Sequence, residues 1–435
     1  MKKKIFPSGM IALIATMLLF GLTADADSAA AEEPLIVTAS AAQKLKLVIA
    51  QPQLPAGAAT PDQAAQLVEL LRFDLDFAGP FAVEIEKRSE QRGIKPGEFD
   101  FAPLKAAGAK YLLLSSYGVT NAQLTLECRL YHVESKQLLT SKRYTARNDD
   151  LRIVGHTFSD EILNAVTGKP GPFAGRVLFV SRKSGNKELA VMDYDGHKVH
   201  ALTANGSINI NPALSPSGKE AVYISYKNGA PDLYRKALVS GAESRLTNGK
   251  GSSISPAYSP DGKKIAVSLS SEGNAEIYTI GTDGKGLKRL TRNPAIDISP
   301  SWSPDGTKLL FVSDRLGNPQ LFVMDADGAN AHRLTTTGNY NVSPQWSPTG
   351  DRIAFARSHD GEFQIFTITP DGGNEVRLTS QGRNDHPHWS PDGRFIIFDS
   401  NRQGKDAIFI MRGDGSQQTR ISEGKGETEP SWSVR

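Results

Sequence analysis

The chain lacks the residue patterns that disulfide scaffolds, thiolate metal clusters and nucleic-acid binding require. Its single cysteine, Cys128, excludes an intramolecular disulfide and a cysteine-based zinc cluster. Its 50 basic and 47 acidic residues leave a formal charge of only +3, which does not indicate a nucleic-acid partner. Beyond residue 31, no apolar run is long enough to cross a bilayer. The chain does contain many glycines and prolines, 40 and 25 residues, as expected of a protein with many tight turns.

The first 31 residues have the layout of a secretory signal peptide. Lys2–Lys4 give a positive start, Met10–Leu22 form an apolar stretch, and small residues with possible cleavage sites follow at Ala24–Ala31. The apolar stretch has 13 residues, fewer than the roughly 20 that a spanning helix needs. We therefore expect residues 1–31 to be removed and the mature chain to be exported, with no membrane insertion afterwards.

The second half of the chain is a repeat with a period of 43 or 44 residues. One phrase places a proline, two residues and Ser-Pro-x-Gly before an apolar run. The serine of this phrase recurs at Ser215, Ser259, Ser303, Ser347, Ser390 and, in a truncated copy, Ser433. A second phrase, Arg-Leu-Thr, keeps the same phase and begins at Arg245, Arg289, Arg333 and Arg377. This period with strand-like runs predicts the four-stranded blades of a β-propeller.

Each repeat is interpreted as four strands, named A to D in chain order. Ser-Pro-Asp-Gly forms the tight turn between A and B, Asp-Gly the turn between C and D, and Arg-Leu-Thr ends strand D. Strand A carries one large apolar residue at a fixed phase: Leu214, Tyr258, Trp302, Trp346, Trp389 or Trp432. We expect this stripe, which includes all four tryptophans, to pack between blades rather than to form an aromatic ligand cage.

The number of blades follows from the two ends of the repeat. Arg176–Val180 is a strand B with no strand A before it, and Glu429–Ser433 is a strand A with no blade after it. We expect these two to complete one blade, a 3+1 closure that leaves no open edge. The predicted fold class is therefore an α/β N-terminal domain followed by an all-β six-bladed propeller. Its boundaries are 32–167 for the first domain, 168–174 for a linker and 175–435 for the propeller.

The first domain alternates strand and helix patterns. Strands are predicted at Leu45–Ala50, Phe81–Ile85, Tyr111–Ser116, Gln123–His132 and Leu138–Thr145. Helices are predicted from Pro61 onward, at Phe101–Ala107 and at Asp150–Thr167. Cys128 falls on the apolar side of a strict alternation, which predicts a buried side chain.

The two rims of the propeller differ in the sequence. Successive strands run antiparallel, so the A–B and C–D turns share one rim, and the D–A and B–C loops share the other. The first rim, here called the constant rim, is much alike in all repeats. The second, here called the variable rim, differs from blade to blade, and we take it as the candidate binding face. Its D–A loops are Ala204–Ile210, Asn248–Ile254, Arg292–Ile298, Thr336–Val342 and Ser380–Asp385.

Motifs for catalysis are missing, so we expect neither an enzyme nor a cofactor or metal ion. The sequence has no G-x-S-x-G, H-E-x-x-H, Walker or G-x-G-x-x-G element. His386 and His388 alternate on a strand A without a nearby third ligand, which favours loop contacts over a metal site. Two alternatives stay open: an exported propeller enzyme with inward carboxylates holding Ca²⁺, and a propeller that binds a small ligand in its central channel.

The domain order and two local patterns resemble the TolB family of the bacterial Tol–Pal system. The resemblance lies in the six WSPDG-type blades and in the junction Arg152…His156…Asp160–Ile162…Thr167-Gly168 before Arg176–Val180. The segment LRFDLDFAGPF, Leu71–Phe81, is also similar to that family. The resemblance implies a non-catalytic periplasmic scaffold that supports outer-membrane integrity and constriction during cell division.

The resemblance also implies two protein partners. One propeller face binds a Pal-like outer-membrane lipoprotein, and the N-terminal segment, about Glu32–Ser40, binds a TolA-like inner-membrane protein. Topology and resemblance together predict lipoprotein contacts at Ser252, Ser253, Asp297, Tyr340, Asn341, Asp385, His386 and Glu427. The family carries a histidine near Ser252 that this chain lacks. In the N-terminal segment the predicted contacts are Glu33, Leu35, Ile36 and Val37.

Overall fold

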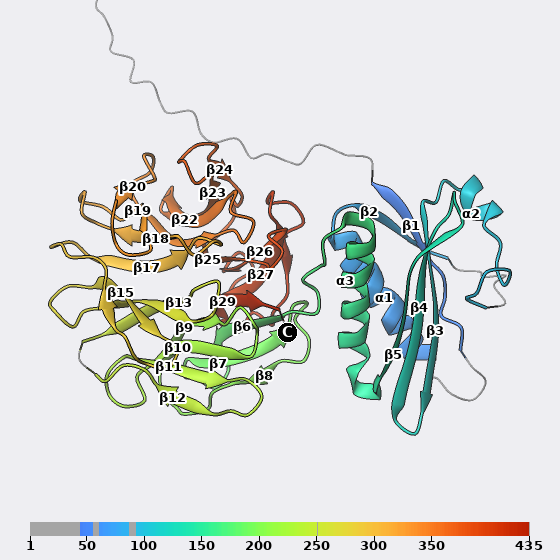
Figure 1. Ribbon diagram of the computed structural model, residues 1–435, viewed down its shortest axis with the longest axis horizontal. Helices are drawn as coiled ribbons and strands as arrows, with labels where there is room; N and C mark the ends of the chain where they lie inside the picture. The colour runs from blue at the N-terminus through green and yellow to red at the C-terminus, as the bar shows by residue number, and fades with distance from the viewer. Residues whose placement is uncertain (1–43, 55–60, 87–92, 250, 435) are drawn as a thin grey trace, which may run out of the picture. The chain divides into compact units, whose positions relative to one another are not determined.

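The computed structural model describes residues 44–54, 61–86, 93–249 and 251–434 (Figure 1). These residues belong to one compact unit. The expected signal peptide and the N-terminal segment lie outside the described residues. No helix within the described ranges is long and apolar enough to span a membrane.

The first domain is built on a five-stranded sheet with the order β2-β1-β3-β4-β5. Strand β1 pairs in parallel with β2 and β3, whereas β3, β4 and β5 form an antiparallel meander. The strands are β1 (Leu45–Ile49), β2 (Phe81–Ile85), β3 (Tyr111–Thr120), β4 (Gln123–His132) and β5 (Gln137–Arg147). The helices are α1 (Pro61–Phe77), α2 (Ala102–Ala106), the short 3₁₀ helix η1 (Asn148–Asp150) and α3 (Leu151–Thr167).

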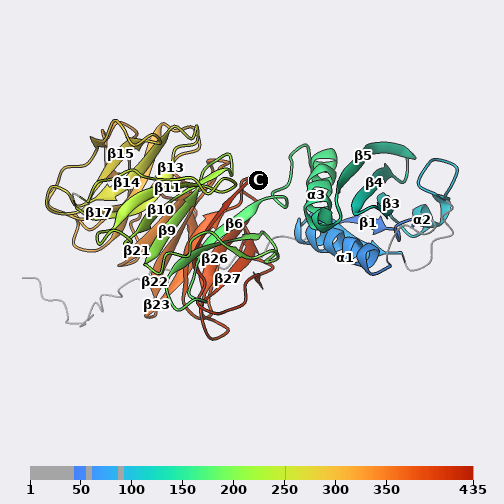
Figure 2. The same cartoon turned by 90° about the horizontal axis from the view of Figure 1, so that it is seen from below.

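Helices α1 and α3 cover one face of this sheet, and Figure 2 shows α1 running along it. Their apolar stripes pack with Cys128 and its neighbours, so the prediction that the Cys128 side chain is buried is confirmed. The two helices approach closely at Gly155, where a Cβ atom would lie 2.8 Å from Leu70 Cδ2. Helix α3 ends at Gly168, whose φ of +74° closes the last turn with an N–H bond to Asn164 O.

Strand β3 is four residues longer than the sequence suggested. The expected end was Ser116, but the strand continues to Thr120, which pairs with Gln123. Asn121 and Ala122 form the two-residue turn between them, with φ of +50° and +60°. A two-residue hairpin turn requires positive φ at both central residues, which matches the strand twist. The sequence did not show this because Ala122 carries no turn signal.

The described residues of the second domain form six four-stranded sheets. Blade 1 contains β29 (Thr428–Ser433), β6 (Arg176–Ser181), β7 (Glu188–Asp193) and β8 (His200–Ala201). Blade 2 contains β9 (Asn209–Leu214), β10 (Glu220–Ser225), β11 (Asp232–Ala237) and β12 (Glu243–Arg245). Blade 3 contains β13 (Ser253–Tyr258), β14 (Lys264–Leu269), β15 (Glu276–Gly281) and β16 (Lys288–Arg289).

The remaining blades repeat the pattern. Blade 4 contains β17 (Asp297–Trp302), β18 (Lys308–Ser313), β19 (Gln320–Asp325) and β20 (His332–Arg333). Blade 5 contains β21 (Asn341–Trp346), β22 (Ile353–His359), β23 (Glu362–Ile368) and β24 (Val376–Arg377). Blade 6 contains β25 (Asn384–Trp389), β26 (Phe395–Ser400), β27 (Ala407–Arg412) and β28 (Thr419–Arg420). In blade 1 the last strand, β29, pairs antiparallel with β6, and Trp432 lies opposite Val177.

The Arg-Leu-Thr phrase recurs because its last residue ties strand D to strand C. In blade 2 the Thr247 hydroxyl donates to the Asp232 carboxylate (2.8 Å) and accepts the Leu233 N–H (2.9 Å). In the other blades Thr203, Thr291, Thr335, Thr379 and Ser422 accept the equivalent strand C N–H. Asp-Gly recurs in the C–D turns for steric reasons, since a Cβ at Gly328 would lie 2.6 Å from Leu290 O in the preceding blade.

The aromatic stripe of strand A packs between blades, as predicted. Trp302 is buried among apolar residues of blades 3 and 4, and its Nε1 donates to Ala257 O of blade 3 at 3.2 Å. Trp389 makes the equivalent bond to Gln345 O at 3.3 Å. Each strand A also has a bulge at the residue before its proline, which takes φ between +49° and +56°. These six residues, here called the bulge ring, are Asn211, Ser255, Ser299, Ser343, His386 and Glu429.

Candidate partner-binding rim of the propeller

The variable rim carries one residue per blade at an equivalent position, three residues before the bulge ring. These six residues, here called the rim ring, are Ile208, Ser252, Ile296, Tyr340, Arg383 and Gly426. In five blades its carbonyl accepts an N–H from the B–C loop, at 3.0–3.3 Å. For example, Tyr226 N donates to Ile208 O and Ser358 N donates to Tyr340 O. The backbone of the rim ring is therefore fixed, and its side chains can vary without disturbing the blades.

Large apolar side chains occupy half of this ring. The exposed fractions are 46% for Ile208, 45% for Ile296 and 43% for Tyr340. Leu316, in the B–C loop beside Ile296, is 60% exposed. The Tyr340 ring also meets Phe363 edge-on, with centroids 5.7 Å apart. Exposed apolar side chains gathered on one face are typical of interaction sites on soluble proteins.

Basic residues gather on the rest of the variable rim, in the loops of blades 6 and 1. Arg182, Lys183, Lys405 and Lys425 are exposed there, whereas Glu423 is the only exposed acid in loops 182–187, 401–406 and 423–427. Lys183 and Lys425 lie 3.4 and 2.6 Å from Glu423. We call these three loops the basic arc. The variable rim thus combines apolar positions on blades 2, 4 and 5 with a positive arc on blades 6 and 1.

Four residues that the sequence predicted as partner contacts are buried inside the blades. Ser253, Asp297, Asn341 and Glu427 are 1%, 0%, 0% and 4% exposed. They share one position, directly after the rim ring, where an extended chain turns its side chain inward. Asn341 donates to Gln320 Oε1 at 2.8 Å, and Asp297 pairs with Arg315 at 2.9 Å. These side chains are bonded within the blades, and a partner contact at these four residues stays a prediction.

Glu427 has a particular structural role. In five blades an acid or amide at the start of strand C accepts the threonine hydroxyl that ends strand D, as Gln320 accepts from Thr335. In blade 6 that place is taken by Ala407, and Glu427 accepts the Ser422 hydroxyl instead, at 3.2 Å. Its carboxylate also accepts the N–H groups of Gly424 and Lys425, each at 2.9 Å.

His386 lines the channel rather than the outer rim, and Asp385 beside it is buried. Asp385 is 8% exposed and accepts the Ser343 hydroxyl at 2.8 Å. His386, a member of the bulge ring, lies 2.7 Å from Asp399 Oδ1 through its Nδ1. Burial alone would lower the pKa of His386, but the carboxylates of Asp385 and Asp399 outweigh it and raise the pKa to about 10. Of the eight predicted propeller residues, Ser252 and Tyr340 therefore occupy the rim ring.

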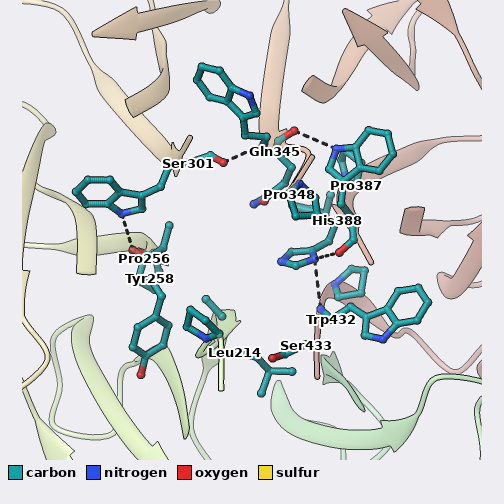
Figure 3. Close-up of a pocket in the computed structure, with 18 of the residues that line it drawn as sticks. Leu214, Pro256, Tyr258, Ser301, Gln345, Pro348, Pro387, His388, Trp432 and Ser433 are labelled. Atoms are coloured by element: carbon teal, nitrogen blue, oxygen red, sulfur yellow. Dashed lines mark hydrogen bonds between the residues drawn. The ribbon is translucent and has the colours of Figure 1, made fainter. Parts of the chain in front are cut away.

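The central channel contains a cavity of about 540 Å³ (Figure 3). The bulge ring, the prolines that follow it and the aromatic stripe line this cavity. Figure 3 shows His388 on the channel wall, where its Nδ1 lies 3.3 Å from Trp432 N. Burial lowers the pKa of His388 to about 4, so the ring is neutral at physiological pH. Within the described ranges no group of three or more His, Cys, Asp or Glu side chains could hold a metal ion.

The predicted contacts Glu33, Leu35, Ile36 and Val37 lie outside the described residues. Sequence reasoning missed Ile208, Ile296 and Leu316. A signal for the first two was present in the repeat phase. The position two residues after the rim ring is apolar in most copies, as at Ile210 and Ile254, whereas the rim ring itself holds Ile, Ser, Ile, Tyr, Arg and Gly. A repeat position whose residue type varies between blades, next to a position that stays apolar, is one where the fold does not require a particular side chain.

Comparisons with known proteins give a consistent family assignment. A family described as the TolB beta propeller domain matches residues 163–435, and the TolB amino-terminal domain matches residues 35–139. The chain is 53% identical to the Tol-Pal system protein TolB of Geobacter metallireducens and 49% identical to that of Geobacter sulfurreducens, each over 185 residues. Both alignments cover 42% of this chain and 43% of the relative, so less than half the length of these relatives is matched.

A solved structure is similar over nearly the whole chain. The crystal structure of TolB from Acinetobacter baumannii has a TM-score of 0.79 and 26% identity, and the match covers 90% of this chain and 97% of that chain. The nidogen/laminin complex, with 13% identity, a TM-score of 0.51 and 60% of this chain covered, shares the fold alone.

Proposed function

The chain belongs to the TolB family, and we propose that it acts as a non-catalytic scaffold of the Tol–Pal system in the periplasm. In this proposal the variable rim binds an outer-membrane lipoprotein of the Pal type. The N-terminal segment, Glu32–Ser40, binds an inner-membrane protein of the TolA type. By linking the two membranes the protein supports outer-membrane integrity and constriction during division. The names of the curated relatives support a role in the Tol–Pal system, and the exposed apolar side chains of the variable rim support the binding of a protein partner.

The rim ring is the observation that carries the proposal. Apolar anchors at the centre of an interface supply most of its binding energy when their backbones are already ordered. Ile208, Ile296 and Tyr340 meet this description, because each is exposed and its carbonyl is held by the neighbouring loop. The basic arc adds a preference for a partner with an acidic flank.

Substitution in the rim ring tests the proposal. We expect Ile296→Ser and Tyr340→Ala each to weaken binding to the soluble domain of the cognate lipoprotein about tenfold, since truncating an apolar anchor costs more than about 1 kcal/mol. Leu287→Ser is the matched control, because Leu287 is 52% exposed but lies in a C–D turn of the constant rim. Titration calorimetry measures the three affinities. If Ile296→Ser and Tyr340→Ala bind as tightly as the Leu287 control, the variable rim is not the interface.

The channel cavity favours one second candidate, the binding of a small ligand. Its volume of about 540 Å³ lies in the range of small-molecule sites. Its lining combines the proline and aromatic surfaces with the polar groups of Gln345 and His388. Native mass spectrometry of protein purified from the envelope distinguishes the two candidates. A small molecule bound in the cavity adds a small, defined mass, whereas a lipoprotein partner is too large for the cavity and adds the mass of a whole protein.

A further inference from the structure

A buried group of charged side chains crosses from the first domain to the constant rim of the propeller. Helix α1 contributes Asp74, helix α3 contributes Arg152 and His156, and the turn after β7 contributes Tyr194 and Asp195. The side chains of Asp74, His156 and Asp195 are 0%, 1% and 7% exposed. This cluster has no part in the proposed partner binding, and its residues lie in distant parts of the sequence.

His156 lies between two carboxylates that belong to different domains. Its Nδ1 is 2.8 Å from Asp74 Oδ2, and its Nε2 is 3.3 Å from Asp195 Oδ2. The Tyr194 hydroxyl donates to the other oxygen of Asp74, and Arg152 pairs with Asp195. A neutral imidazole has one N–H and could face only one of these carboxylates as a donor. The Nε2 contact with Asp195 is an ion-pair distance without hydrogen-bond geometry, whereas Nδ1 is within hydrogen-bond distance of Asp74. Two carboxylates facing one buried ring favour the imidazolium form, in which both ring nitrogens carry a proton.

Among His156, Arg152, Asp74 and Asp195, the charges balance only when His156 is protonated. The positive groups are then His156 and Arg152, and the negative groups are Asp74 and Asp195. Two further titratable groups face the cluster. His197 lies 3.3 Å from Asp195 Oδ1 but is 58% exposed. Asp160 is half-buried and accepts the N–H groups of Phe173 and Ala174 in the linker. Burial alone would lower the pKa of His156, but Asp74 and Asp195 raise it to about 10.

Aromatic rings exclude water from the cluster. Phe77 of α1 stacks on Phe395 of the propeller, with centroids 4.9 Å apart. Tyr194 stacks on Trp432 at 5.8 Å and contacts Phe173 of the linker at 5.1 Å. These rings belong to one apolar cluster that is continuous from the first domain to blades 1 and 6. A charge left unpaired in such surroundings is costly, so losing one ion pair of the cluster should also destabilise the others.

We propose that protonated His156 is an electrostatic clamp that fixes the first domain on the constant rim, and that losing its proton or either carboxylate releases the domain while both folds persist. The clamp controls how the linker is held against the propeller. The proposal does not depend on the variable rim or on any partner.

The protonation state of His156 is the most direct test, and it uses the unaltered mature chain. Two-bond ¹H–¹⁵N spectra of histidine side chains distinguish imidazolium from neutral imidazole, and His156→Gln identifies the signal that belongs to His156. We expect imidazolium shifts for this residue at pH 8, which is above the ordinary histidine pKa of about 6.5. Neutral shifts for His156 at pH 8 would overturn the clamp.

Domain release is the second test. Limited proteolysis of the linker, residues 168–174, should become at least tenfold faster in His156→Gln and in Asp195→Asn, with the excised propeller remaining resistant. His197→Gln is the matched control, since it faces the same carboxylate from the exposed side. The double variant His156→Gln/Asp195→Asn removes one charge of each sign, so it leaves fewer unpaired charges than the single variants do. Its increase in cleavage rate should therefore be smaller than the product of the two single-variant increases. Cleavage at the wild-type rate in both single variants, or equally fast cleavage in His197→Gln, would refute the proposal.

Discussion

The two rims of the propeller use the same blades for opposite purposes. The constant rim buries charged side chains, such as Asp195 against His156, and shares an apolar core with the first domain. The variable rim buries its polar side chains within each blade and leaves Ile208, Ile296 and Tyr340 at the surface. Charge alone is thus a poor guide to the recognition surface of this protein. The acids and histidines near both rims mostly hold the fold together.

The repeated threonine bond explains how the variable rim can diverge safely. Each D–A loop begins at a residue such as Thr247 or Thr335 that is tied to strand C, and ends at a buried first residue of strand A. Both ends of the loop are fixed by side chains inside the blade. Substitutions in the rim ring therefore change the surface that a partner meets without changing the blade beneath it.

The largest expected effect is on the constant rim, from removing the last strand. Truncation after Gly426 deletes β29, which exposes the edge of β6 and removes Trp432 from its stack with Tyr194. Loss of a buried tryptophan alone costs about 3–5 kcal/mol, and the open edge adds to that. We expect the cooperative thermal transition to move down by 10 °C or more, on the order of the shift such losses give. Truncation after Ser433 is the control and should melt like the full chain.

An unchanged melting temperature after removal of β29 would show that the ring does not depend on closure by the C-terminal strand. In that case the packing of the C-terminal strand near the first domain would not stabilise the constant rim. The two rims would then differ in sequence but not in their contribution to stability.

The second effect is the pH dependence of the constant rim. The pKa of His156 is raised in the folded chain from 6.5 to about 10, so its contribution is complete below pH 6.5 and is lost as the pH rises toward 10. The loss is at most about 5 kcal/mol, from ~1.4 kcal/mol for each pKa unit. Unfolding free energy measured by denaturant from pH 6 to 10 should fall for the wild type. The slope should be smaller in His156→Gln, and equal slopes would assign the fall to other groups.

Most of the fold could be predicted from sequence because the strand pattern recurs in six blades, whereas the direction in which single rim side chains point could not. Neighbouring residues of an extended chain point to opposite sides, so an error of one residue exchanges buried for exposed positions. The prediction included both members of the pairs Ser252/Ser253 and Tyr340/Asn341, but in blade 4 it named Asp297 instead of Ile296. The buried position of Asp297 depends on its pairing with Arg315, 18 residues away, which local sequence does not reveal.

The His156 cluster illustrates a different limit. The sequence singled out His156 as part of the junction pattern, but its partner Asp74 is 82 residues earlier and in a different helix. No periodicity links these positions. Only the packing of α1 on α3 and of both against the turn after β7 brings them together.

A third, smaller effect separates structural from recognition residues on the variable rim. Glu427→Ala should lower the unfolding free energy by about 1–3 kcal/mol, because it leaves the Ser422 hydroxyl and two loop N–H groups without their acceptor. Adding Ala407→Gln should recover part of this loss, because blades 4 and 5 carry glutamine at that place. Denaturant unfolding measures both variants. We expect Glu427→Ala to weaken lipoprotein binding only as far as it destabilises the loop. A loss of binding affinity without a loss of stability would show that Glu427 contacts the partner directly.

The smallest expected effect concerns the basic arc. Lys183 and Lys425 are 62% and 54% exposed, so reversing their charge should change the unfolding free energy by no more than about 0.5 kcal/mol. A positive arc beside an apolar interface mainly accelerates the approach of an acidic partner. Lys183→Glu with Lys425→Glu should therefore slow association with the lipoprotein severalfold at low salt, with little change in dissociation. The difference in association rate between the variant and the wild type should shrink at 0.5 M salt, because charges farther apart than the Debye length of ~4 Å are then largely screened.

Lys285→Glu is the matched control for the basic arc, since Lys285 is exposed on a C–D turn of the constant rim. A single reversal there changes the net charge of the protein but not the field near the variable rim. Stopped-flow association rates at two salt concentrations compare the variants. If Lys285→Glu slows association by as much per reversed charge as the double arc variant, the effect comes from net charge, and the two rims are electrostatically equivalent for partner capture. If only the arc variants slow it, the lipoprotein approaches from the side of the propeller that the first domain leaves uncovered.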